Sequence, residues 1–143
     1  MNSDILKIAL SQYGIIEIPS KEKNSPDIMR YFNDIGHKWV KDDETAWCSA
    51  FINWVALKAG CEKSDKLDAR SWLKVGEVTL EPEPGDIVIF WRVKPDSWKG
   101  HVSIYINKIN DAIYCLGGNQ GNMVQVSSYP AGRLLGYRKL KKI

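Results

Sequence analysis

Cys48 stands where a polar, acidic stretch of the chain gives way to an apolar one, a position that suits a nucleophile. Phe51, Val55 and Ala59 recur every four residues after it and Gly60 is a natural stop, so the spacing predicts a helix that begins at Cys48. Free backbone N–H groups and the positive end of the helix dipole favour a thiolate in a first helical turn. A thiolate of low pKa is what a cysteine nucleophile needs. The alternative is that Cys48 is a small buried apolar residue, as free cysteines often are.

His101 and Asn119 are candidates for the base and for the group that orients it. His101 begins a predicted strand, and Asn119 follows the end of the next strand along the chain. If the turn at Asp111 folds these two strands back on each other, Asn119 comes near His101. A polar partner on the second ring nitrogen would then fix the tautomer and orientation of a histidine base. Taken singly, each residue has a plainer interpretation: His101 as a surface or satisfied core residue, and Asn119 as a turn residue among glycines.

The elements that must position these residues fall into two groups. Ser3 is the predicted N-cap of a first helix that runs to about Tyr13, and Ser25 with Pro26 opens a second helix through Phe32. From residue 77 onward apolar residues alternate, and turn residues separate the predicted strands 87–91, 101–106, 112–116, 123–126 and 134–138. Helices followed by an antiparallel meander predict one α+β domain over residues 1–143. Residues 1–42 would form its N-terminal helical part, and residues 43–143 a core that holds the cysteine and the histidine.

The composition fits a folded globular protein, since 44% of its 143 residues are apolar. A net charge of +3 without a dense Lys/Arg run gives no sign of a nucleic-acid module. Three cysteines, two histidines and no CxxC pair argue against a structural zinc site, and we expect neither metal nor cofactor. Cys48 and Cys61 would lie roughly 20 Å apart at opposite ends of one helix, too far for a disulfide. We therefore expect a reduced protein with one reactive thiol.

The N-terminal residues lack a basic segment followed by an apolar run, and no stretch is long enough for a membrane span. We expect a monomer made in the cytoplasm without a signal peptide and without stable membrane insertion. A target outside the cytoplasm would then require release or delivery by another system.

Three short segments occur in an order known from one superfamily. They are Trp47-Cys-Ser-Ala-Phe51, Pro84-Gly-Asp-Ile-Val-Ile-Phe90 and Gly100-His-Val-Ser-Ile-Tyr105. Together they resemble the cysteine, proline-glycine-aspartate and histidine motifs of the papain-like cell-wall hydrolases, the CHAP and NlpC/P60 superfamily. The resemblance covers about Asp43 to Arg138, and the region before Asp43 is similar to a small phage-associated branch.

The resemblance implies a papain-like fold and a cysteine peptidase or amidase that acts on peptidoglycan. Cys48 would be the nucleophile, His101 the base and Asn119 the third polar residue, with the backbone N–H of Cys48 and one further donor forming the oxyanion hole. CHAP enzymes often carry a glutamate two residues before this asparagine. Gly117 stands in that place, which favours a Cys–His–Asn triad over a four-member site. The bond cut would be the N-acetylmuramoyl-L-alanine amide or a peptide bond of the stem or cross-bridge.

Several further residues are candidates for the substrate groove, because stem peptides and sugars offer both apolar faces and amides. They are Trp47, Trp91, Trp98 and Gln120, and each has packing as its alternative role. Asp43 lies in an acidic loop that either holds a stem-peptide amine or is simply solvated.

Three functions remain open at this point. The first is a lytic enzyme of the phage-lysin or interbacterial type, with a holin or an immunity protein as candidate partner. The second is a noncatalytic wall-binding module on the same fold, although binding alone requires no thiol beside a base. The third is a cytosolic thiol peptidase or deamidase.

Overall fold

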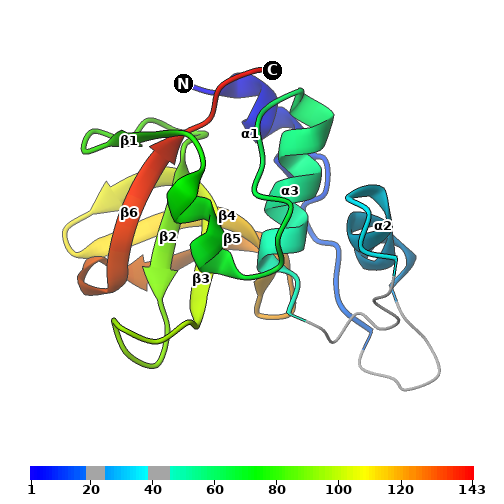
Figure 1. The fold of residues 1–143 in the computed structure, drawn as a ribbon. Helices are drawn as coiled ribbons and strands as arrows, with labels where there is room; N and C mark the ends of the chain where they lie inside the picture. Colours follow the sequence, from blue (N-terminus) through cyan, green and yellow to red (C-terminus); the bar gives the residue numbers. More distant parts are fainter. Residues whose placement is uncertain (19–24, 39–45) are drawn as a thin grey trace.

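The computed structural model describes residues 1–18, 25–38 and 46–143. Within these ranges three α-helices and two short 3₁₀-helices accompany a six-stranded sheet of order β1-β6-β2-β3-β4-β5, in which every pair of neighbours is antiparallel (Figure 1). The helices are α1 (Ser3–Leu10), α2 (Pro26–Asp34), α3 (Cys48–Ala59), η1 (Ala69–Lys74) and η2 (Ala131–Arg133). The strands are β1 (Glu77–Thr79), β2 (Ile87–Trp91), β3 (Gly100–Ile109), β4 (Ala112–Gln120), β5 (Met123–Pro130) and β6 (Leu134–Lys139). The α+β prediction is confirmed.

The first two helices begin at side-chain caps. Ser25 Oγ accepts a hydrogen bond from the backbone N–H of Ile28 at 3.4 Å, as predicted. The cap of α1 is Asn2 rather than Ser3, because Asn2 Oδ1 accepts from the N–H of Ile5 at 3.3 Å. This helix also ends at Leu10, before the predicted Tyr13, and the chain continues as a turn.

Helix α3 is the centre of the molecule rather than an amphipathic surface helix. Residues 48–56 are all buried, although Ser49 and Asn53 are polar. Helices α1 and α2 and strands β3 and β4 all contact α3, and α2 lies on the side of α3 away from the sheet (Figure 1). The segment before and within η1 covers the polar residues: Ser49 Oγ donates to Lys66 O at 2.6 Å and accepts from Trp72 Nε1 at 3.0 Å. The first turn of α3 is therefore enclosed by protein except where the site opens.

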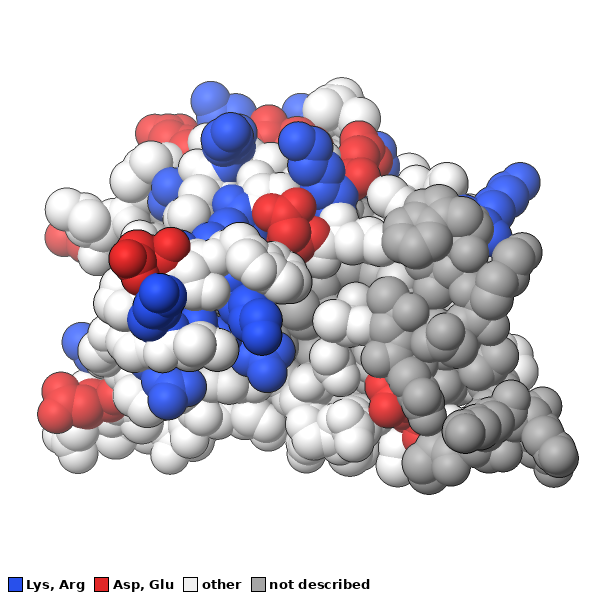
Figure 2. Space-filling model, turned by 60° about the horizontal axis from the view of Figure 1, so that its bottom comes forward, with Lys and Arg blue, Asp and Glu red and all other residues white. Residues whose placement is uncertain are grey.

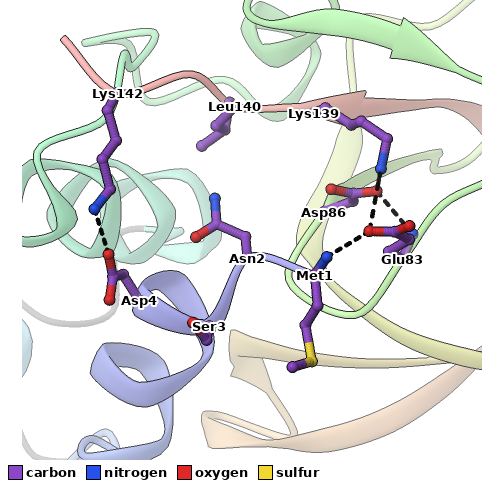
Figure 3. A pocket seen from close by; sticks show the side chains of 9 residues that line it. All are labelled: Met1, Asn2, Ser3, Asp4, Glu83, Asp86, Lys139, Leu140 and Lys142. Carbon is purple, nitrogen blue, oxygen red and sulfur yellow. Dashed lines mark hydrogen bonds and ion pairs between the residues drawn. The ribbon is translucent and has the colours of Figure 1, made fainter.

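The proline-glycine-aspartate segment lies at the opposite end of the molecule from the first turn of α3, beside both termini (Figure 3). Asp86 is buried, and its Oδ2 accepts from the N–H of Glu83 at 2.8 Å and from Lys139 Nζ at 2.7 Å. Gly85 has a φ of 98°, and a Cβ there would lie 2.5 Å from Asn2 O. This segment therefore joins the N-terminus, β2 and β6, and its role is structural.

Candidate active site

Cys48 is the first residue of α3 and is 6% exposed. Trp47 precedes it at the N-cap position and makes no capping hydrogen bond through its side chain, so the first-turn N–H groups keep their capacity to face an anion. Burial raises the pKa of the Cys48 thiol, but the hydrogen bond and charge of His101 and the N–H groups of Val102 and Ser49 lower it by more. The pKa therefore lies below its ordinary value, as a nucleophile requires.

His101 is buried near the start of β3, where it pairs across the sheet with Phe90. The ring of Tyr129 lies against it with centroids 4.9 Å apart and planes at 30°. His101 Nε2 is 2.9 Å from Gln120 Oε1. Because that oxygen only accepts hydrogen bonds, the neutral ring carries its proton on Nε2, and Nδ1 is left to accept the thiol proton.

Gln120 is held so that only its oxygen can face the histidine. Its Nε2 donates to the backbone oxygens of Cys115, at 3.2 Å, and Gln125, at 2.6 Å, and both of these groups are acceptors. Oε1 also accepts from Ser103 Oγ at 2.8 Å. Rotating the amide by half a turn would set its N–H₂ against His101 and leave two carbonyls facing an oxygen. The hydrogen-bond network thus fixes which way the amide points.

The geometry corrects the prediction for Asn119. The residue in contact with His101 is Gln120, one position later, and Asn119 instead lines a cavity beside the ring. The cause is a register shift between Gly117 and Gln120 in the pairing of β4 with β5, where Asn119 has a φ of 59°. A Cβ on Gly117 would lie 2.7 Å from Gln120 Oε1. The Gln120 amide therefore fills the space into which a side chain at position 117 would project.

The predicted groove residues divide between core and surface. Trp47 is fully buried and its Nε1 donates to Glu17 Oε1 at 3.0 Å, so it packs rather than contacting substrate. Gln120 is 1% exposed and holds His101, so the groove prediction is wrong for it too. Trp91 and Trp98 do line hollows beside the site. Asp43 lies outside the described residues.

Two hollows flank the cysteine and the histidine. One of about 190 Å³ is bordered by Cys48, Asp68 and the 73%-exposed Trp98, and the other, of about 300 Å³, by His101, Asn119 and Tyr129. Arg92 borders both. They open at the end of the molecule where α3 begins, and Figure 2, which looks onto this end, shows several Lys and Arg side chains close together.

The loop between β2 and β3, which carries Trp98, is held in place from η1. Arg70 donates to three of its backbone oxygens: Nε to Lys99 O at 2.9 Å, Nη1 to Pro95 O at 2.9 Å and Nη2 to Lys94 O at 3.2 Å. These bonds fix the wall of the hollow on the Cys48 side. The sequence analysis did not single out Arg70, because its role depends on a loop 24 to 29 residues away.

Tyr129, Arg92 and Arg133 are the other site residues that the sequence analysis missed. Tyr129 lies on β5, which continues to Pro130 rather than ending at residue 126 as predicted. Residues 127–130, Ser-Ser-Tyr-Pro, show no apolar alternation that would have predicted the longer strand. For the two arginines no local pattern distinguishes them from surface cations.

The other two cysteines, Cys61 and Cys115, are free and buried, and neither has the lowered thiol pKa of a nucleophile. Burial raises the pKa of the Cys115 thiol to about 12, although a hydrogen bond with Ser103 lowers it in part. Burial also raises the pKa of the Cys61 thiol. Among the described residues no three His, Cys, Asp or Glu side chains gather as a metal site would require. No described helix is both long enough and apolar enough to cross a membrane.

Comparisons with known proteins bear on the fold and the family of this chain. No curated protein matches the chain. The solved structure of a protein similar to a lipoprotein of the NLP/P60 family, from Staphylococcus aureus subsp. aureus Mu50, superposes with a TM-score of 0.57 at 21% identity. The match covers 96% of this chain and 40% of that one, and it shows a shared fold. The CHAP domain profile matches residues 40–119, more than half of the sequence and the part that carries Cys48, His101 and Asn119. The chain therefore belongs to the CHAP domain family, within the CHAP and NlpC/P60 superfamily of cell-wall hydrolases.

Proposed function

We propose that this protein is a cysteine hydrolase that cuts an amide or peptide bond of peptidoglycan. Membership of the CHAP family supports action on the cell wall. The observation that carries the proposed mechanism is the arrangement at the start of α3: a thiol of lowered pKa beside a histidine whose far nitrogen is held by Gln120. A binding module needs neither feature, so this arrangement favours catalysis over noncatalytic wall binding.

The reaction follows from these groups. The Cys48 thiolate attacks the carbonyl carbon, and the oxyanion is stabilised by the backbone N–H of Cys48 with a second donor. The C–N bond then breaks while His101 gives its proton to the leaving nitrogen, which leaves a thioester on Cys48. Water attacks the thioester as His101 takes its proton. The C–S bond breaks, and the acid product leaves the enzyme in its starting state.

The amidase and endopeptidase forms of this reaction share the same steps and differ only in the bond presented to Cys48. We further propose a lytic role, either as a phage-type lysin that reaches the wall through a holin or as a toxin passed between bacteria and neutralised by an immunity protein. The described residues bear on the attack by Cys48, which both settings share. A neighbouring holin gene would indicate the phage-type lysin, and a neighbouring immunity gene would indicate the toxin.

Digestion of purified sacculi with mass spectrometry of the soluble fragments tests the proposal and identifies the bond. We expect new termini from wild-type protein and none from Cys48→Ala. Cys61→Ala is the matched control, because it removes a buried thiol at the other end of α3 and should leave cleavage in place. Circular dichroism establishes that each variant is folded. Equal cleavage by Cys48→Ala would exclude Cys48 as the nucleophile, whereas sacculus binding without fragments from wild type would favour the wall-binding alternative.

A further inference from the structure

Among the residues that the structure describes, those lining the cavity beside His101 include no Asp or Glu. Its lining residues are Phe90, Trp91, Arg92, His101, Asn119, Asn122, Tyr129 and Arg133. Among the described residues, two guanidinium groups therefore border about 300 Å³ of space, and the other polar side-chain groups there are two amides, a phenol, an indole N–H and the imidazole. Within the described part of the chain neither Arg92 nor Arg133 forms an ion pair with a carboxylate.

Arg133 packs against a tryptophan, and Arg92 lies near Tyr129. Arg133 lies over the ring of Trp91, 5.3 Å from its centroid, and Trp91 Nε1 donates to the backbone oxygen of Gly132 at 3.3 Å. Arg92 follows β2 and lies close enough to Tyr129 for its charge to lower the pKa of that phenol, although burial and the charges of Cys115 and Cys48 raise it overall. An anion between two positive charges relieves their mutual repulsion. A carboxylate suits this place, because its two oxygens pair well with a planar guanidinium.

The direction of the reaction determines which part of a substrate enters this cavity. The acyl group stays bonded to Cys48, whose own hollow is the one bordered by Asp68 and Trp98. The leaving nitrogen must meet His101 to receive its proton, so the chain beyond that nitrogen passes into the cavity that His101 lines. We propose, on the basis of the proposed function, that Arg92 and Arg133 form a subsite for a carboxylate carried by the leaving-group half of the stem peptide. The enzyme would then select stem peptides whose carboxylates are free over those whose carboxylates are amidated.

Calorimetric binding to Cys48→Ala, which cannot turn over, tests this subsite separately from catalysis. The probes are a synthetic N-acetylmuramoyl stem peptide with free carboxylates and the same peptide with each carboxylate converted to a primary amide. We expect the acid to bind at least tenfold more tightly than the amide. Adding Arg92→Gln or Arg133→Gln should remove most of that preference while changing amide binding less than twofold.

Arg30→Gln is the matched control, because Arg30 also lies over a tryptophan, at 5.6 Å from the Trp54 ring, but on α2. It removes the same charge and should keep the preference for the acid. The subsite is overturned if the free-carboxylate peptide binds no better than the amidated peptide, or if neither peptide binds detectably. It is also overturned if the preference for the free carboxylate survives both arginine substitutions. If the preference is found but wild type cuts no sacculi, the proposed function fails, and the two arginines bind a carboxylate without forming a leaving-group subsite. If wild type cuts acid and amide peptides equally, the subsite fails and the function stands.

Discussion

Neighbouring groups lower the pKa of the Cys48 thiol, and His101 is the main one. Gln120 affects that pKa indirectly, because it holds His101 in place. Gln120→Ala removes the acceptor at His101 Nε2, so the imidazolium is less stabilised and lowers the Cys48 pKa by less. A free cysteine has a pKa of about 8.5, and we expect iodoacetamide alkylation of wild-type Cys48 to reach half its maximal rate below that pH. In Gln120→Ala the midpoint should move upward, and alkylation at pH 6 should slow several-fold.

Asn119→Ala is the control for this experiment, since Asn119 lines the cavity and His101 Nε2 makes its described hydrogen bond with Gln120 instead. Its alkylation profile should follow that of wild type. Peptide mapping assigns the label, and Cys61 and Cys115 should react later because burial raises the pKa of both thiols. A midpoint that moves in Asn119→Ala and stays in Gln120→Ala would restore Asn119 as the residue that orients the base.

The difference between these two residues shows how far the sequence could determine the site. The positions of Cys48 and His101 near the starts of their elements were predictable because each element has a strong local pattern, an apolar helix ended by Gly60 and an alternating strand. The third residue depends on where a bulge falls in β4. A shift of one residue there turns a side chain to the other face, and nothing local in a glycine-rich segment fixes it. The identity of the orienting residue therefore required the structure.

At the scale of elements, β4 passes close to α3 through two adjacent glycines that serve different purposes. A Cβ on Gly118 would lie 2.6 Å from Trp47 and 2.8 Å from Phe51 Cβ, so this glycine lets the strand pack on the helix. A Cβ on Gly117 would meet Ser103 Oγ and Gln120 Oε1, so this glycine leaves room for the amide that holds His101. Substituting each residue separates packing from catalysis.

We expect Gly118→Ala to lower the free energy of unfolding by about 1–3 kcal/mol, the usual cost of overpacking a core. Gly117→Ala should be milder in stability, because side chains rather than the helix must move, and should lower kcat on muropeptides by tenfold or more. Urea unfolding and steady-state kinetics measure the two effects. Gly132→Ala is the control, since nothing lies within 4 Å of a Cβ at that position. Full activity in a stable Gly117→Ala protein would contradict the role given to the Gln120 amide.

The helices and strands were predicted better than their surroundings. Alternation gave the course of β2, β3 and β4, and the apolar spacing with Gly60 gave both ends of α3. The same spacing suggested an amphipathic helix, whereas the first nine residues of α3 are buried on all sides. Burial of Ser49 and Asn53 depends on the segment around Lys66, which folds over them from outside the helix. A periodicity within one element cannot report what packs on it from elsewhere.

The whole molecule has a reactive end, where α3 begins, and a structural end, where the Pro84-Gly85-Asp86 segment meets the termini (Figure 3). If these ends have separate roles, a substitution at the structural end should change stability without changing chemistry. Asp86→Ala leaves the N–H of Glu83 and the Lys139 ammonium without their buried acceptor. Loss of hydrogen bonds to a buried charged group costs about 2 kcal/mol, so the urea midpoint should fall while kcat and KM at 25 °C stay within twofold of wild type. Asp111→Ala, at an exposed turn, should change neither quantity. A fall in kcat for folded Asp86→Ala would mean that the two ends are coupled through β2 and β3.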